Sequence, residues 1–152
     1  FKPMAETSLD ELRRAMDINV WANKVILDWF ATPHPPRQVV LISSGAAITG
    51  HSGWGTYALS KAALNMLTQL YAHDLPATHV AALAPGLVHT AMQDYIYEQV
   101  DEQRFPSVKQ LKQARGTPAM PEPDEAARLM ATAIEKLPQR IDSGSFADIR
   151  NF

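Results

Sequence analysis

Two short apolar runs separated by a long helical pattern restrict the fold of this chain more than any other feature. Residues 38–43 (QVVLIS) and 78–84 (THVAALA) are rich in aliphatic side chains and show no polar alternation. Such runs are typical of strands buried on both faces of a parallel sheet. Residues 57–75, between them, carry leucines at helical spacing. A strand, a long helix and a second strand predict an α/β fold with a parallel sheet.

Further elements flank this unit. Residues 7–30 form an apolar stripe at helical spacing behind a capping box, with Ser8 as N-cap and Glu11 three residues later. Residues 123–136 predict another helix, and residues 144–149 a last short strand. Residues 90–103 are compatible with a helix. Three strands are few for a doubly wound sheet, so we expect one domain, residues 1–152, that supplies only part of such a fold.

Composition excludes several classes of protein. Lys and Arg number 14 against 16 Asp and Glu, with no basic run, which argues against nucleic-acid or membrane-surface binding. No apolar stretch reaches the roughly 18 residues of a membrane span. Cysteine is absent, so thiolate metal sites are excluded, and the five histidines show no metal-ligand spacing. We therefore expect no metal, no membrane and no nucleic acid, and the absence of cysteine is consistent with a cytoplasmic protein.

Polar and turn-forming residues follow both predicted buried strands. Ser44 comes directly after the first, and the Pro85-Gly86 turn follows the second. Tyr57 and Lys61 lie four residues apart at the start of the helix between them. Parallel sheets bind ligands beyond the carboxyl ends of their strands. We therefore expect these residues to converge on one crevice.

Such a group of residues supports proton transfer. Residues four apart on a helix share one face, so Lys61 can approach Tyr57. A cation within about 4–6 Å lowers the pKa of a phenol by about 1–3 units, toward the range useful in acid–base catalysis. Ser44 could hold a substrate carbonyl. Hydride, which no side chain supplies, calls for a nicotinamide cofactor.

Each residue also has an ordinary interpretation. A Tyr-x-x-x-Lys pair alone arises easily by chance, and Ser44 alone is compatible with a loop or capping serine. Asn19, within an apolar helix, is compatible with a satisfied polar residue or a local bend. Pro85-Gly86 alone is a turn. Only their joint order indicates a site.

That joint order resembles the short-chain dehydrogenase/reductase family. The resemblance rests on DINV (17–20), VVLISSGAA (39–47), YALSK (57–61) and APGLVHTAM (84–92), and it covers residues 3–95 best. Ser44 precedes Tyr57 by the thirteen residues usual in that family, which favours Ser44 over Ser43.

The resemblance implies a Rossmann-like doubly wound sheet and a role for each matching residue. Tyr57 would be the catalytic acid/base, Lys61 would assist it and hydrogen-bond the nicotinamide ribose, Ser44 would polarise the carbonyl, and Asn19 would support a water-linked proton relay. Residues implied to contact the cofactor are Tyr57, Lys61, Pro85, Gly86, Val88 and Thr90.

The ending GSFADIRNF and the loop before Tyr57 look closest to the sepiapterin reductase and benzil reductase branch, which implies reduction of a ketone or diketone with NADPH rather than NADH. The family's glycine-rich turn and Asn-Asn-Ala-Gly stretch are not in these residues, and the chain starts with phenylalanine. We therefore expect the C-terminal catalytic half of the fold, without the dinucleotide-binding half or the residues that select NAD or NADP.

Two other classes remain open. A catalytically incompetent oligomerisation or interaction module is the main alternative, because half a doubly wound sheet would expose an edge and an apolar face. A hydrolase is weaker, because no G-x-S-x-G motif is present. The resemblance implies a homodimer or homotetramer that acts on a small carbonyl substrate.

Overall fold

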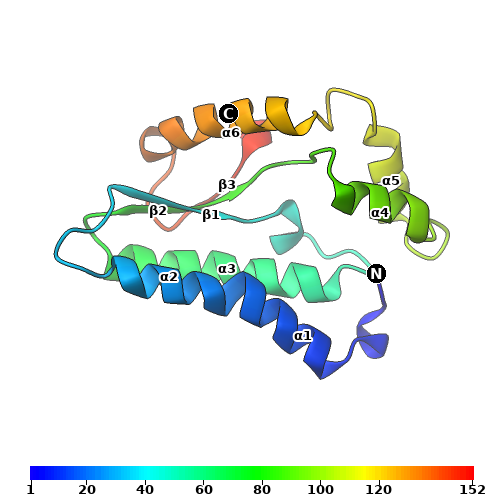
Figure 1. The fold of residues 1–152 in the computed structure, drawn as a ribbon, viewed down its shortest axis with the longest axis horizontal. Coiled ribbons are helices and arrows are strands. Elements are labelled where there is room, and N and C mark those ends of the chain that lie inside the picture. Colours follow the sequence, from blue (N-terminus) through cyan, green and yellow to red (C-terminus); the bar gives the residue numbers. More distant parts are fainter.

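A three-stranded parallel sheet forms the centre of the computed structural model, which describes residues 1–152 (Figure 1). Its strands are β1 (Gln38–Ile42), β2 (His79–Ala84) and β3 (Phe146–Asp148), in the order β1-β2-β3. Both pairings are parallel, so all three carboxyl ends lie at the same edge of the sheet. The predicted parallel α/β architecture is confirmed.

Helices cover both faces of this sheet (Figure 1). One face carries α1 (Leu9–Met16), α2 (Ala22–Phe30) and α3 (Gly55–Asp74). The other face carries α6 (Pro123–Arg140), while α4 (Ala91–Gln99) and α5 (Ser107–Ala114) lie at the end of the molecule near the N-terminus. None of these helices combines the length and the apolar content needed to cross a bilayer.

The first helix begins at the predicted capping box. The Ser8 hydroxyl accepts a hydrogen bond from the Glu11 amide at 3.2 Å, and the Glu11 carboxylate accepts one from the Ser8 amide at 2.9 Å. A π-helical turn, Asp17–Trp21, joins α1 to α2. Such turns are frequent at functional sites, and this one contains Asn19. Asn19, for which the sequence left open a local bend or a satisfied polar residue, therefore lies in a π-helical turn.

The core is divided by the sheet. Beneath α1–α3 the buried residues are Val20, Leu27, Leu41, Leu64, Leu67, Tyr71, Leu75 and Val80. Beneath α6 they are Ala81, Leu83, Ala133, Leu137 and Ala147. A third cluster fixes α4 to α5 through Ile96, Val100, Phe105, Val108 and Leu111.

Two apolar segments of the sequence are buried only in part. Residues 38–43 were predicted to be buried on both faces, but β1 is an edge strand of this sheet and Ile42 is 47% exposed. Within the apolar stripe of residues 7–30, Val20 and Leu27 are buried, whereas Trp29 is 74% exposed. Periodicity locates an apolar face but does not specify what covers it.

Two helices also differ from their predictions. Helix α5 was not predicted, because its segment carries only a short amphipathic pattern. Helix α6 extends beyond residue 136 and includes Pro138 near its end. A proline leaves the carbonyl four residues earlier without its helical donor. That carbonyl, of Ile134, accepts a hydrogen bond of 2.9 Å from Gln38 Nε2 on β1, so the proline is accommodated by a contact to the sheet.

Candidate active site

Lys61 lies at the carboxyl edge of the sheet and does not extend into water. Its Nζ donates a hydrogen bond of 2.8 Å to the carbonyl of Ile42, the last residue of β1. The same atom lies 5.8 Å from the centroid of the Tyr57 ring. Burial lowers the pKa of the Lys61 ammonium below its usual 10.5. The predicted proximity of this lysine to Tyr57 is therefore present, and two of its three N–H donors have no partner within the chain.

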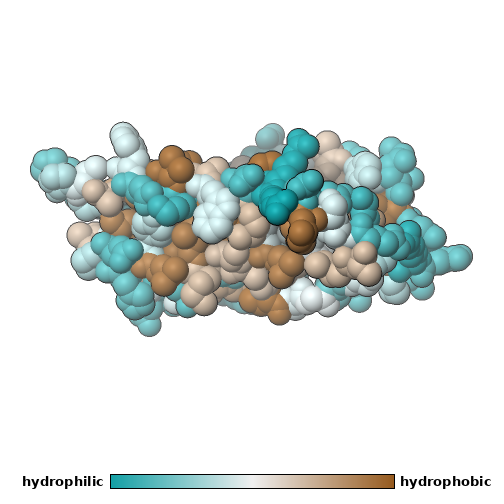
Figure 2. Space-filling model, turned by 90° about the horizontal axis from the view of Figure 1, so that it is seen from below, coloured by the Kyte–Doolittle hydropathy of each residue, from teal (hydrophilic) through white to brown (hydrophobic).

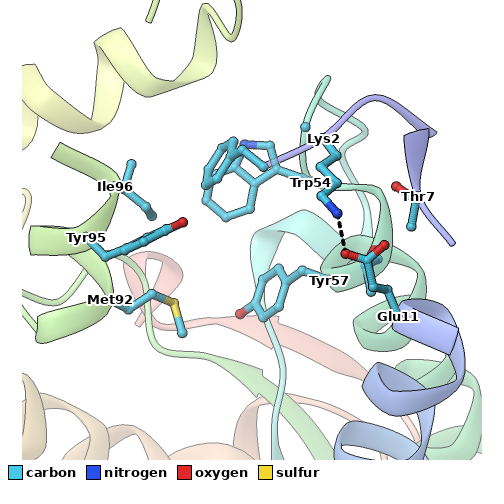
Figure 3. A pocket seen from close by; sticks show the side chains of 11 residues that line it. Lys2, Thr7, Glu11, Trp54, Tyr57, Met92, Tyr95 and Ile96 are labelled. Atoms are coloured by element: carbon cyan, nitrogen blue, oxygen red, sulfur yellow. Dashed lines mark hydrogen bonds and ion pairs between the residues drawn. The ribbon is translucent and has the colours of Figure 1, made fainter. Parts of the chain in front are cut away.

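Tyr57 lines a cavity of about 290 Å³ formed by three separate parts of the chain (Figure 3). Phe1 and Lys2 come from the N-terminal segment, Trp54 from the start of α3, and Met92, Tyr95 and Ile96 from α4. In Figure 3 the Tyr57 ring lies between Glu11 on one side and Met92 on the other. This apolar cavity, the Tyr57 cavity below, suits an uncharged ligand.

The Tyr57 cavity has a charged pair at its edge. Lys2 Nζ donates to Glu11 Oε1 at 2.6 Å. That contact and the Ser8 hydrogen bonds lower the pKa of Glu11 to about 2. Glu11 therefore stays ionised at neutral pH and has no proton to give. The phenol of Tyr57 is the better placed proton donor for a bound ligand.

The two serines after β1 have different environments. Ser43 is 1% exposed and its Oγ donates to Asn65 Oδ1 on α3 at 2.6 Å. Ser44 is half-buried, and its Oγ accepts from the Ala46 amide at 3.2 Å, which leaves its O–H unused within the chain. Ser43 therefore fixes the strand to the helix, whereas Ser44 remains available to a ligand, which supports the choice of Ser44.

Ser44 lines a second cavity, of about 240 Å³, called the Ser44 cavity below. Its lining is more polar and includes Gln110, Asp148 and Arg150. Arg150 Nε and Nη2 donate to the two carboxylate oxygens of Asp148 at 2.7 and 2.6 Å, and this contact lowers the pKa of Asp148. The structure thus brings Ser44 and Tyr57 to the same end of the molecule, but into neighbouring cavities.

Asn19 reaches the helix that carries Tyr57 through a residue that the sequence did not indicate. Its Nδ2 donates to Ser60 Oγ at 3.0 Å, and that hydroxyl donates to the Tyr57 carbonyl at 2.8 Å. Ser60 is fully buried. Its place one turn after Tyr57, facing the core, is the only signal that could have identified it.

The turn after β2 contributes a glycine to the lining of the Ser44 cavity. Gly86 has a φ of +71°, and a Cβ there would lie 3.3 Å from Ile149 Cγ2, so this close turn needs glycine. Gly86 lines the Ser44 cavity, whereas Pro85, Val88 and Thr90 lie outside the linings of both cavities. Thr90 is exposed at the start of α4.

His89, in the same turn, was not singled out from the sequence. Its Nδ1 lies 2.8 Å from Glu122 Oε1 and its Nε2 lies 3.3 Å from Asp94 Oδ1. The first of these hydrogen bonds chiefly raises the pKa of His89. Arg115 also donates to Asp94 at 2.9 Å. His89 thereby connects the turn to α4 and to the residue before α6.

The described residues fit one end of a dinucleotide. A half-buried ammonium with spare donors, a phenol and a close glycine turn gather at the carboxyl edge, where open parallel sheets bind dinucleotides. Residues 1–152 contain no G-x-G-x-x-G turn to hold a pyrophosphate. No group of three or more His, Cys, Asp or Glu side chains is arranged so that it could hold a metal ion.

Comparison with known proteins gives a consistent result. The family model described as short chain dehydrogenase matches residues 1–101. A benzil reductase ((S)-benzoin forming) of Bacillus subtilis is 29% identical over 160 residues, which cover 99% of this chain and 64% of that protein. Sepiapterin reductase of Bos taurus is 39% identical over 82 residues, 53% of this chain and 31% of that protein.

Solved structures agree in fold. A short chain dehydrogenase/reductase of Saccharomyces cerevisiae superposes with a TM-score of 0.79 at 23% identity, covering 97% of this chain and 60% of that one. The chain therefore spans under two thirds of the length of these relatives.

Proposed function

This chain belongs to the short chain dehydrogenase family, and we propose that the whole protein reduces a small ketone or diketone to an alcohol with a reduced nicotinamide cofactor. The observation that carries the proposal is the joint position of Tyr57 and Lys61. The phenol lines an apolar cavity, and the half-buried ammonium lies 5.8 Å from its ring. The benzil reductase relative supports a dicarbonyl as the substrate class.

The proposed roles follow from the chemistry of each side chain. The cofactor, when bound, supplies hydride to the carbonyl carbon. Tyr57 donates its phenolic proton to the carbonyl oxygen as that oxygen gains negative charge, and Ser44 donates a hydrogen bond to the same oxygen. Lys61 stabilises the resulting tyrosinate and donates to the cofactor ribose. The products are the alcohol and the oxidised cofactor, and solvent returns the proton to Tyr57.

Asn19 has a different role in this proposal. Through Ser60 it fixes the π-helical turn to the helix that carries Tyr57. Its position supports a path along which water returns the proton. Pro85, Gly86, Val88 and Thr90 would face the nicotinamide through the backbone of their turn.

NADPH is the cofactor we propose in preference to NADH. Support comes from the resemblance to the sepiapterin reductase and benzil reductase branch. Relative turnover with NADPH and NADH measures this preference directly, and equal or better turnover with NADH would contradict it.

The experiment that tests the function uses the full-length protein, an aryl 1,2-diketone and each reduced nucleotide, followed by nucleotide absorbance. We expect turnover by wild type and a loss of about 10²-fold or more in Lys61→Met. Lys109→Met, an exposed lysine on α5 without an ion pair, is the matched control and keeps wild-type turnover. Absence of turnover on any carbonyl would refute the function and favour an interaction module.

We also propose that the protein forms a homodimer or homotetramer. The face made by α1, α2 and α3 exposes apolar side chains along its length (Figure 2). Val25 and Trp29 on α2 are 67% and 74% exposed. Exposed apolar patches of this kind usually mark protein interfaces. Light scattering of the full-length protein should give two or four copies, and a monomer at micromolar concentration would contradict the proposal.

A further inference from the structure

The Tyr57 cavity and the Ser44 cavity share a single lining residue, Trp54. The first has a volume of about 290 Å³ and the second about 240 Å³. The two cavities differ in chemistry. Met92, Tyr95 and Ile96 make the first apolar, whereas Gln110 and the Asp148–Arg150 pair make the second polar. Trp54 therefore borders both an apolar space and a polar one.

Three parts of the chain hold the Trp54 indole in this position. Its Nε1–H donates to Ser107 Oγ on α5 at 2.9 Å. The Phe1 ring packs edge-on against it with centroids 4.7 Å apart, and the Tyr57 ring lies 6.0 Å away. These contacts restrict the orientation of the half-buried indole, whose N–H has its hydrogen-bond partner.

A reacting carbonyl must reach two groups that line different cavities, Tyr57 in one and Ser44 in the other. The proposed function requires its oxygen to accept from Tyr57 and from Ser44 at once, so the carbonyl lies where the two cavities meet, at Trp54. Its two substituents then extend to opposite sides of the indole. An apolar substituent is favoured beside Tyr95 and a polar one beside Gln110, because burying an unpartnered polar group costs free energy.

We propose that Trp54, positioned by Ser107, is the residue that determines substrate orientation and hence the configuration of the alcohol. This inference rests on the proposed function. A bound cofactor would supply hydride to one face of the carbonyl, so exchanging the two substituents would yield the opposite enantiomer. The substrate class that the divided site favours is an unsymmetrical ketone with an apolar group on one side and a polar, uncharged group on the other.

The test uses the full-length protein and methyl benzoylformate, which has a phenyl ring and an ester on either side of its ketone. The two enantiomers of methyl mandelate are separated by chiral chromatography. Wild type should give one enantiomer in large excess. Trp54→Ala should lower the enantiomer ratio about tenfold or more, the usual effect of losing a discriminating pocket contact. Ser107→Ala should lower it less, because the indole remains but is no longer fixed.

A control variant and a binding measurement accompany this test. Ser52→Ala, an exposed serine of the loop before α3 without a hydrogen bond, is the control for Ser107→Ala and keeps the wild-type ratio. Calorimetry without cofactor compares the Kd of the two methyl mandelate enantiomers, and their ratio should fall in both Trp54 and Ser107 variants. If Trp54→Ala gives no cooperative melt, Ser107→Ala and Trp54→Phe decide.

The outcomes separate the two proposals. Turnover by wild type with an unchanged enantiomer ratio in Trp54→Ala and Ser107→Ala would overturn the role of Trp54 and leave the function standing. No turnover by wild type on any ketone would overturn the function, and the orientation proposal would fall with it.

Discussion

Replacing Ser60 by alanine should destabilise the fold through one buried hydroxyl that connects two helices. This side chain is fully buried, accepts from Asn19 Nδ2 at 3.0 Å and donates to the Tyr57 carbonyl at 2.8 Å. The Tyr57 carbonyl keeps its helical partner, so the main loss is the partner of the Asn19 amide. That amide is half-buried, and a hydrogen bond of this kind contributes about 0.5–1.5 kcal/mol, so we expect the free energy of unfolding to fall by that amount.

Urea denaturation of Ser60→Ala, Asn19→Ala and the double variant measures this contact. The double-mutant cycle should give a coupling of about 0.5–3 kcal/mol, as for residues in direct contact. Ser52→Ala is the matched control and should stay within about 0.5 kcal/mol of wild type. A Ser60→Ala loss no larger than that of Ser52→Ala, or a coupling near zero, would refute the reasoning.

Two more perturbations test the surroundings of the site. Gly53 has a φ of +89°, and a Cβ there would lie 2.6 Å from a Phe105 ring carbon, so Gly53→Ala should lower the free energy of unfolding by at least about 1–3 kcal/mol. A Cβ at Gly50 would meet open space, so Gly50→Ala should leave the free energy of unfolding unchanged. Equal urea midpoints for Gly53→Ala and Gly50→Ala would contradict this contrast. The pKa of His89 is raised chiefly by Glu122, so its contribution to stability is complete below about pH 6.5 and is lost as pH rises through the raised value. His89→Gln should therefore destabilise more at about pH 6 than at about pH 9, and a pH-independent difference would show that the contact is unimportant.

Much of the fold could be predicted from the sequence, because its capping residues and its apolar spacing indicate the same helices and strands. The capping box at Ser8, the run that becomes β2 and the leucine spacing of α3 each predict the element that is present. The exposure of Ile42 and Trp29 was not predictable in this way. Burial depends on which elements lie beside a strand or a helix, and that information is in the tertiary arrangement.

The candidate site was predictable in part for the same reason. Lys61 and Tyr57 share a helix, so their proximity follows from helical geometry. Trp54 and Ser107 are 53 residues apart, and Ser60 contacts Asn19 across 41 residues. Contacts over such separations leave no periodic signal in the chain. The catalytic roles of Tyr57, Lys61, Ser44 and Asn19 stay predictions until they are measured.

The most direct test of the central claim is the turnover number of Tyr57→Phe in the full-length protein, with NADPH and an aryl diketone. We expect a fall of about 10²–10⁴-fold, because the substitution removes only the proton that the phenol donates. Tyr97→Phe is the control, since that phenol hydrogen-bonds the Leu111 carbonyl and Met120 away from the Tyr57 cavity, and it should stay within a few-fold of wild type. Turnover by Tyr57→Phe within a few-fold of wild type would contradict the assignment of Tyr57 as the proton donor.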